Sequence, residues 1–299
     1  MWTKENIPDQ SGKISIVTGA NTGIGFETAL ALSQAGATVI IAGRDSGRVN
    51  EAVYKINNLG GKISGEILDL VSIDAVKRFS EEIKNKYDRL DLLINNAGVM
   101  IPPAGTTADG YELQFGINFL GHFALTGHLY PLLNITPGAR VVTVSSGAHR
   151  FVDGVDLENV RLQKGYDAYR EYAVSKLANL QFVIELQKRL SQMGSDLLSV
   201  GAHPGVTETE LSRHMPQADY KAAVERFSHL MPAWQGALPS LYAAVSPDVK
   251  GGGYYGPDGE GELHGYPAPA KITEAVADEK LGKELWNFAE NATGLRYPM

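Results

Sequence analysis

The sequence predicts an α/β fold: a doubly wound parallel sheet between two layers of helices, in a single domain. Short apolar segments alternate with stretches whose apolar residues recur at helical spacing, and a glycine-rich turn follows the first apolar segment. Repeated strand–helix units favour a parallel sheet with helices on both faces, a three-layer αβα arrangement. Such folds routinely carry about 250 residues on one sheet. We therefore expect residues 1–299 to form one domain.

The expected elements follow one another along the chain. Strands are predicted where short apolar or β-branched runs end in a turn signal, at residues 14–18, 38–42, 63–68, 92–94, 140–145 and 197–202. Helices are predicted at 24–35, 48–59, 73–87, 111–133 and 169–192. Two segments interrupt the alternation: residues 147–167, and a substrate-side lobe at 204–270. Irregular segments at strand carboxyl ends usually bind ligands, with ordinary surface loops as the alternative.

Residues 273–294 are predicted to form an amphipathic helix that ends the chain. Val276, Leu281, Leu285 and Phe288 are available for one face of this helix. We interpret this apolar stripe as a packing surface against the rest of the domain.

Composition excludes several classes of function. The 27 Lys and Arg against 34 Asp and Glu give a net charge of −7 without a basic run, so nucleic acid is not an expected partner. The chain has no Cys, which excludes disulfides, thiolate nucleophiles and Cys-containing metal sites. No apolar stretch approaches the roughly 18 to 20 residues of a membrane span, so we expect no membrane partner and a cytoplasmic location. The oligomeric state is open, with a homo-oligomer such as a dimer among the alternatives.

The histidines do not predict a metal site. His122 and His128 are six residues apart on a predicted helix and so face different sides, and His149 and His203 lack acidic or histidine neighbours at ligand spacing. We expect His203 to pack beneath a bound cofactor.

A glycine turn joins the first predicted strand to the first predicted helix. Residues 18–25 read Thr-Gly-Ala-Asn-Thr-Gly-Ile-Gly. Glycine lets the backbone approach a pyrophosphate closely, while the N–H groups and dipole of the following helix favour its negative charge. The position of this turn in a repeated strand–helix pattern predicts a Rossmann-type nucleotide site. Its predicted contacts are Gly19, Asn21, Thr22, Gly23, Ile24 and Gly25.

The end of the second predicted strand indicates the type of nucleotide. An NAD site usually has an acid here to bind the ribose 2′-hydroxyl, but this chain has Gly43 followed by Arg44. The Arg44 guanidinium would attract a 2′-phosphate. NADP(H) is therefore the preferred cofactor, with NAD(H) as the alternative if Asp45 faces the ribose instead.

A phenol and an ammonium lie four residues apart in Tyr172-Ala173-Val174-Ser175-Lys176, on one face of a predicted helix. Reducing a carbonyl requires a hydride on carbon and a proton on oxygen, and a nicotinamide supplies only the hydride. A free tyrosine has a pKa near 10, which suits proton exchange poorly. An ammonium about 4 Å away contributes about 4 kcal/mol at an effective dielectric near 20. We therefore expect Lys176 to lower the pKa of Tyr172.

Several motifs in a fixed order carry a family resemblance. The glycine turn is followed by Asn95-Asn96-Ala97-Gly98, then Asn118, Ser145-Ser146, Tyr172 with Lys176, and His203-Pro204-Gly205. In this order the chain resembles the short-chain dehydrogenase/reductase family, and looks closest to its retinol dehydrogenase-like and WW-domain oxidoreductase-like branch. The resemblance covers nearly the whole chain and implies that Arg44 selects NADP, Asp69 meets the adenine, and Thr209 reaches the nicotinamide carboxamide. The other cofactor contacts that it implies are Leu70, Asn95, Ala97, Gly98, Tyr172, Lys176, Pro204, Gly205 and Val206.

The resemblance also implies a catalytic tetrad of Asn118, Ser146, Tyr172 and Lys176. Ser146 would bind the substrate oxygen, with Ser145 as the competitor for that role, and Asn118 would hold a water that connects Lys176 to solvent. The 26-residue interval from Ser146 to Tyr172 is longer than in compact members of the family. We therefore expect the rim of the pocket to differ from that of compact members. The helix pairing by which compact members form tetramers is also expected to differ.

The leading hypothesis is an NADP(H)-dependent oxidoreductase that interconverts an apolar aldehyde or ketone and the corresponding alcohol by hydride transfer. An NAD-dependent alcohol dehydrogenase working in the oxidative direction, and a non-catalytic dinucleotide-binding regulatory protein, are the alternatives. The expectation of an apolar substrate depends on residues that could form the pocket wall, with core packing as their other explanation. These are Met100, Ile101, Pro102, Pro103, Met215, Phe227, Leu230, Met231 and Trp234.

Overall fold

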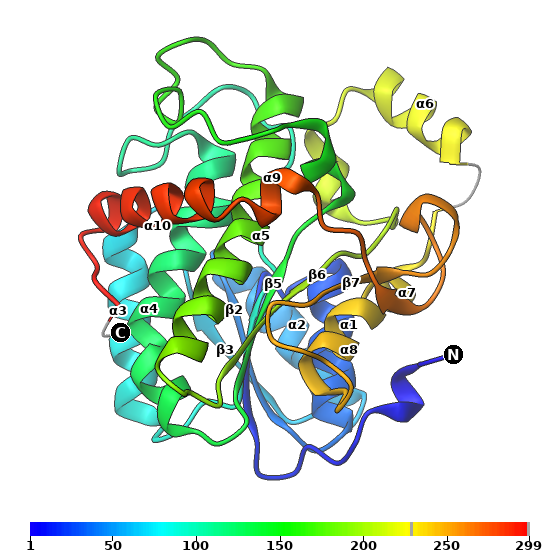
Figure 1. The fold of residues 1–299 in the computed structure, drawn as a ribbon. Helices are drawn as coiled ribbons and strands as arrows, with labels where there is room; N and C mark the ends of the chain where they lie inside the picture. The colour runs from blue at the N-terminus through cyan, green and yellow to red at the C-terminus, as the bar shows by residue number, and fades with distance from the viewer. Residues whose placement is uncertain (228–229, 298–299) are drawn as a thin grey trace.

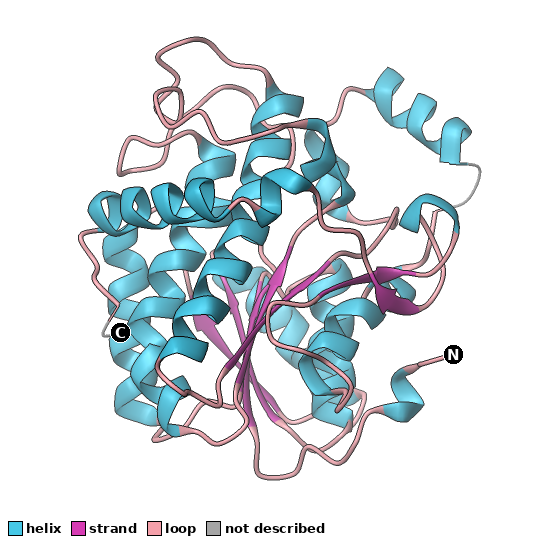
Figure 2. Cartoon of the chain, in the orientation of Figure 1, coloured by secondary structure: helices cyan, strands magenta, loops and turns pink. Residues whose placement is uncertain are grey.

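A computed structural model describes residues 1–227 and 230–297 and confirms the predicted fold class. Eight strands form one sheet in the order β3-β2-β1-β4-β5-β6-β7-β8, with helices on both faces (Figures 1 and 2). Every neighbouring pair is parallel except β7 with β8. The strands are β1 Ile14–Thr18, β2 Thr38–Gly43, β3 Ile63–Ile67, β4 Leu92–Asn95, β5 Arg140–Val144, β6 Leu198–Ala202, β7 Tyr254–Pro257 and β8 Pro267–Pro269.

The helices of the first half are α1 Gly23–Gln34, α2 Ser46–Asn58, α3 Ile73–Lys86 and α4 Gly121–Ile135. A π-helical turn at Phe115–Leu120 leads into α4. The second half has α5 Ala168–Gln192, α6 Gln217–Phe227, α7 Ala233–Gly236, α8 Leu238–Val245, α9 Glu274–Ala277 and α10 Glu279–Thr293, with short 3₁₀ turns at Gly147–Phe151, Glu210–His214 and Glu260–Glu262. Figure 1 shows α6 set apart from the main body. Within the described ranges, no helix combines the length and apolar character needed to cross a bilayer.

The strand order reverses at β1, which pairs with β2 on one side and with β4 on the other. The connections from β1 and β4 therefore leave the sheet in opposite directions and open a crevice at the carboxyl ends of these two strands. In open α/β sheets, that crevice is where ligands bind.

Two hydrophobic layers hold helices to the sheet. One contains β2 and β4 residues such as Ile40 and Leu93 with α3, α4, α5 and α10, and the other contains Ile41 and Ile94 with α1, α2 and α8. The inward residues of a parallel strand alternate between the two faces, so neighbouring positions enter different layers.

The carboxyl end of the chain differs from the prediction in two ways. Residues 273–294 form two helices, because Asp278 interrupts the predicted helix and its carboxylate accepts hydrogen bonds from the N–H groups of Lys280 and Leu281 at the start of α10. The buried face of α10 includes Leu285 as expected, but also Trp286, whose ring lies 5.1 Å from that of Phe123 in α4.

The sequence prediction also missed β7 and β8. Pro257 ends β7, and two of the three residues of β8 are prolines, so neither segment has the apolar run that predicts a strand. Proline is tolerated there because β8 is the edge of the sheet. These strands bring residues 258–266 to the same edge of the sheet as the crevice.

The segment before the π-helical turn buries an acid. Glu112 is inaccessible to solvent, and one carboxylate oxygen accepts a 2.7 Å hydrogen bond from the N–H of Phe115. The other oxygen, Oε1, has no hydrogen-bond partner among residues 1–227 and 230–297. Burial, with a smaller contribution from Glu171, raises the pKa of Glu112 from its ordinary value of 4.5 to about 7.

This raised pKa predicts a pH-dependent effect of Glu112→Gln on stability. The folded protein holds the Glu112 proton more tightly than the unfolded chain does, so the contribution of this group is fully present below pH 4.5 and is lost as the pH rises to about 7. Measured by urea unfolding, the stability of the variant relative to wild type should therefore rise by roughly 2 to 3 kcal/mol between pH 5 and pH 8. The exposed Glu284→Gln controls for the replacement of a carboxylate by an amide at the surface. Parallel pH profiles of wild type and Glu112→Gln would contradict the prediction.

Candidate active site

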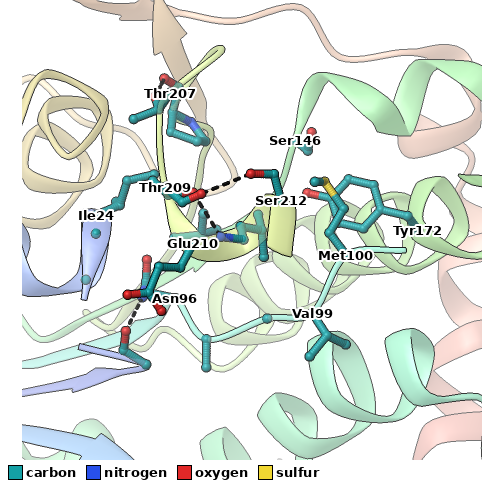
Figure 3. A pocket seen from close by; sticks show the side chains of 18 of the residues that line it. Ile24, Asn96, Val99, Met100, Ser146, Tyr172, Thr207, Thr209, Glu210 and Ser212 are labelled. Carbon is teal, nitrogen blue, oxygen red and sulfur yellow. Dashed lines mark hydrogen bonds between the residues drawn. The ribbon is translucent and has the colours of Figure 1, made fainter. Parts of the chain in front are cut away.

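One large pocket, with a volume of about 1000 Å³, lies at the carboxyl ends of β1, β2, β4, β5 and β6. Figure 3 shows Ile24 and Asn96 on one side of this pocket and Ser146 and Tyr172 on the other. Most of the residues predicted from the sequence line it. They are Gly19, Asn21, Thr22, Gly23, Ile24, Gly25, Arg44, Asp69, Leu70, Ala97, Gly98, Ser146, Tyr172, Lys176, Pro204, Gly205, Val206 and Thr209.

The glycine turn forms one end of the pocket. Gly19 has a left-handed backbone with φ of 65°, and a Cβ there would lie 2.8 Å from the Cα of Ala97. A Cβ on Gly25 would lie 2.4 Å from the Asn96 side chain. Helix α1 begins at Gly23, and its N-cap residue Thr22 makes no side-chain capping bond. The free N–H groups at this helix start suit an anion, and only glycine lets the turn approach its neighbours this closely.

The end of β2 presents a cation to the same pocket. Arg44 is exposed, lines the pocket, and forms no ion pair with any described residue. The Asp45 carboxylate instead accepts a 3.0 Å hydrogen bond from the N–H of Arg48 and caps α2. Asp45 also lines the pocket, and one oxygen of its carboxylate is used by this cap.

A second arginine missed by the sequence analysis, Arg48, also lines the pocket and pairs with Glu210. This ion pair joins α2 to the 3₁₀ turn at Glu210–His214, which belongs to the lobe after Pro204.

Tyr172 and Lys176 lie one turn apart on α5, and both side chains are buried at the pocket wall. The Lys176 ammonium is 5.6 Å from the centre of the Tyr172 ring and donates a 3.2 Å hydrogen bond to the carbonyl of Val144. Burial raises the pKa of Tyr172 to about 12, with partial compensation from the Ser146 hydroxyl, and burial lowers the pKa of Lys176 to about 8. The net shift of the Tyr172 pKa is therefore upward, opposite to the lowering by Lys176 that we expect from the sequence, because the loss of hydration dominates and Lys176 is not among the groups that shift the phenol.

The two candidate serines have different surroundings. The Ser145 hydroxyl is buried and donates a 2.7 Å hydrogen bond to the backbone carbonyl of Lys176. Ser146 begins the 3₁₀ turn Gly147–Phe151, and its hydroxyl is close enough to Tyr172 to affect the pKa of the phenol. Of the two serines, Ser146 thus has its hydroxyl beside the Tyr172 phenol, whereas Ser145 connects β5 to α5.

Neither Asn95 nor Asn118 is among the described residues that line the pocket. Asn95 points into the core, where its amide donates to the Thr126 hydroxyl, and its neighbour Asn96 lines the pocket instead. Side chains alternate along a strand, so the second Asn of the pair faces the opposite way. The Asn118 amide is occupied by the N–H and C=O of Val99 and by the Ser175 hydroxyl. Asn118 thereby fixes the backbone between β4 and the pocket wall.

The wall around Tyr172 is largely apolar. Of the residues expected there, five line the pocket: Met100, Ile101, Met215, Phe227 and Leu230. Met231 is buried in the core and Trp234 is 47% exposed. The wall residues that sequence reasoning missed include Ile117, Phe151, Tyr169 and Tyr220, which come from segments without a recognisable motif.

The histidines form no cluster of three metal-ligating side chains within the described ranges. His122 is buried, bonds the Thr18 hydroxyl at 2.9 Å and the carbonyl of Asn118 at 3.0 Å, and has its pKa lowered to about 4 by burial. His203 lines the pocket. Spacing along the chain showed no acidic neighbour for His203, but the fold places the Glu262 carboxylate 3.1 Å from its Nε2.

Comparison with known proteins agrees with this geometry. The short chain dehydrogenase family profile matches residues 13–219. The chain belongs to the short-chain dehydrogenase/reductase family. As an oxidoreductase of this family it is 38% identical to mouse polyprenol dehydrogenase, over 96% of this chain and 86% of that one. It is also 38% identical to mouse retinol dehydrogenase 13, over 98% of this chain and 86% of the relative.

A solved active-site complex of Pseudomonas aeruginosa RhlG with NADP has the same fold, with a TM-score of 0.65 and 26% identity. The match covers 82% of this chain and 94% of that one. The family and the retinol dehydrogenase-like branch predicted from the motifs are confirmed.

Proposed function

We propose that this oxidoreductase interconverts an apolar carbonyl compound and its alcohol with NADP(H), using Tyr172, Lys176 and Ser146 at the reacting end of the pocket and Asn118 as their support. The observation that carries the proposal is that one pocket joins the glycine turn and Arg44 to Ser146 and Tyr172. A dinucleotide site and a proton donor are thus in the same cavity. Hydride transfer to a carbonyl requires both.

The protein groups suit a nicotinamide dinucleotide phosphate. Gly19 and Gly25 leave space that a Cβ would fill, and the start of α1 offers N–H groups to a pyrophosphate. Arg44 would hold a 2′-phosphate, and Asp69, Leu70, Ala97 and Gly98 would line the adenosine and ribose region with the rest of the predicted contacts. The RhlG–NADP complex supports this assignment. When bound, the nicotinamide supplies or accepts the hydride.

Tyr172 is proposed to give its phenolic proton to the carbonyl oxygen during reduction and to take a proton from the alcohol during oxidation. Its raised pKa keeps the phenol protonated at neutral pH, which suits the donor role. Lys176, with a pKa of about 8, is mostly cationic at neutral pH and stabilises the phenolate formed after transfer. Ser146 donates a hydrogen bond to the substrate oxygen as negative charge develops there.

The proposed substrate is apolar, in keeping with the wall formed by Met100, Ile101, Met215 and Leu230. Two relatives are named for the alcohols polyprenol and retinol, which also supports an apolar alcohol or carbonyl. The cytoplasmic location and the homo-oligomer remain predictions.

Tyr172→Phe tests the proton-transfer step. Removing the hydroxyl leaves the ring in place, so the affinity for NADPH should change by less than about twofold. Turnover of aldehydes, ketones or quinones, followed by NADPH absorbance, should fall roughly 10²- to 10⁴-fold. The exposed Tyr54→Phe is the matched control and should keep wild-type turnover. Unchanged turnover in Tyr172→Phe would remove this residue from the mechanism, and a wild type without turnover would favour a binding protein.

Arg44→Ala tests the cofactor preference. Losing a charge-assisted hydrogen bond to the 2′-phosphate should weaken NADP(H) binding by roughly 10- to 100-fold and leave NAD(H) binding almost unchanged. Both affinities can be measured by calorimetry. The exposed Arg78→Ala on α3 controls for the loss of a surface cation. An equal effect on both cofactors would contradict the assigned role of Arg44.

A further inference from the structure

Three charged or titratable side chains that the proposed mechanism does not use meet beside Ser146. One carboxylate oxygen of Glu262 accepts from the guanidinium of Arg150 and lies 3.1 Å from Nε2 of His203. His203 is 2% exposed, and the side chain of Glu262 is 14% exposed. All three residues line the pocket. The Arg150 side chain is 27% exposed, so the two charged groups are partly buried and are paired with each other.

The hydrogen bonds of His203 define which ring nitrogen carries the proton. The N–H of Gly205 donates to Nδ1 at 3.3 Å, so Nδ1 must be an unprotonated acceptor. The remaining proton is then on Nε2 and is donated to the Glu262 carboxylate. Burial lowers the pKa of His203 and so favours the neutral ring. Glu262 is ionised: burial would raise its pKa, but hydrogen bonds from His203, the Lys271 N–H and Arg150 hold it at about 2.

This arrangement requires an unfavourable backbone conformation at Glu262 and a glycine at position 256. Glu262 has a φ of 61°, a left-handed conformation that is unfavourable for a residue with a Cβ. A Cβ on Gly256 in β7 would lie 1.9 Å from Nε2 of His203, so only glycine leaves room for this ring. Strain of this kind persists where the surrounding structure enforces it, and it concentrates at functional sites.

Two segments of the active site are joined through this one carboxylate. Through His203, Glu262 is connected to the Pro204–Gly205 turn, and the next residue, Val206, donates its N–H to the carbonyl of Leu263 at 2.8 Å. Through Arg150, it is connected to the 3₁₀ turn that Ser146 begins. The two segments follow β6 and β5, and they contribute Gly205 and Ser146 to the pocket.

We propose that Glu262 is a positioning residue: it keeps His203 in the Nε2–H form that accepts from Gly205, and with Arg150 it fixes the Pro204–Gly205 turn relative to Ser146. The inference builds on the proposed function, because these segments would contact the cofactor and the substrate oxygen. Neither Glu262 nor His203 transfers a proton to the substrate in this arrangement. Their effect is on the geometry of the reacting groups.

Glu262→Gln removes one of the two acceptor oxygens at nearly constant volume. The glutamine has one carbonyl oxygen for three donors, namely Arg150, His203 and the Lys271 N–H, which now bond both carboxylate oxygens. We expect kcat to fall on the order of 10- to 100-fold from misplacement of the reacting groups, with a smaller change in KM and an NADPH affinity within about threefold of wild type. Glu279→Gln, which breaks the exposed pair with Lys188, is the matched control and should keep wild-type kinetics. Wild-type kcat in Glu262→Gln would overturn the proposal.

Two substitutions of His203 separate its two hydrogen bonds. An Asn amide oxygen can take the place of Nδ1 and accept from Gly205, whereas a Gln amide can take the place of Nε2 and donate to Glu262. Because the proposed connection from Glu262 to the turn needs both hydrogen bonds, we expect kcat to fall on the order of 10-fold or more in either variant, with a smaller change in KM. Wild-type kcat in His203→Asn would overturn the role of the Glu262 contact, and wild-type kcat in His203→Gln would overturn the role of the Gly205 contact. These two His203 variants also test the positioning role of Glu262 if Glu262→Gln does not fold.

Long-range ¹H–¹⁵N NMR of the imidazoles gives a readout independent of turnover. At pH 7 the His203 signal, identified by its absence in His203→Asn, should show the neutral Nε2–H form in wild type and a changed tautomer distribution in Glu262→Gln. An Nδ1–H form or an imidazolium in wild type would overturn the proposal. A wild type that shows the Nε2–H form but does not turn over any carbonyl or alcohol would contradict the proposed function and leave the positioning intact.

Discussion

The hydroxyl of Thr18 connects the parts on which the pocket depends. It ends β1 and accepts hydrogen bonds from the N–H groups of Asn96 and Ala97, at 3.0 and 2.9 Å, which begin the turn after β4. Its own proton is directed to Nε2 of His122, and Nδ1 of the same ring bonds the carbonyl of Asn118. Burial keeps His122 neutral, so the ring can accept on one side and donate on the other. The two strands that flank the crevice are thereby held to the π-helical turn.

This chain of hydrogen bonds continues through Asn118 to the backbone of the pocket wall. Asn118 belongs to the turn that His122 holds, and its amide bonds both the N–H and the C=O of Val99. Residues 97–101 line the pocket between the glycine turn and Tyr172. The side chains of Thr18 and Asn118 hold the backbone of this segment. Rigid support of this kind is required for precise placement of reacting groups.

Burial determines the pKa shifts of Tyr172 and Lys176, the pair proposed to handle the proton. Loss of hydration moves the pKa of Tyr172 up and that of Lys176 down, so each shift opposes the charged form. A phenolate and an ammonium attract each other, so each charged form is more stable when the other is also present. The pocket therefore favours a protonated phenol at rest, which is the state that the proposed role of Tyr172 as an acid requires.

The sequence predicts the parts of the molecule that local patterns encode. The six strands up to residue 202, the glycine turn and the stacking of Tyr172 on Lys176 follow from periodicity and backbone geometry, and the structure contains them. Asn95 was expected to line the pocket, but the alternation along β4 turns it into the core and exposes Asn96. The direction of the Tyr172 pKa shift also required the structure, because burial depends on the whole fold. Glu262 is 59 residues from His203 in sequence, and no local pattern brings them together.

Many of the features that local sequence patterns do not predict lie in the segments after Pro204. These segments close the pocket. Side-chain contacts between these segments and earlier parts of the chain include Arg48 with Glu210, Arg150 with Glu262, and the Tyr169 hydroxyl with Asp219 in α6. The same segments supply much of the apolar wall, including Met215 and Leu230. The part of the pocket that we propose binds phosphate is thus built from the first strand–helix units, whereas the part that would recognise the substrate depends on side chains far apart in the chain. A family of enzymes can therefore keep its cofactor chemistry in the early motifs and change its substrate through the later segments.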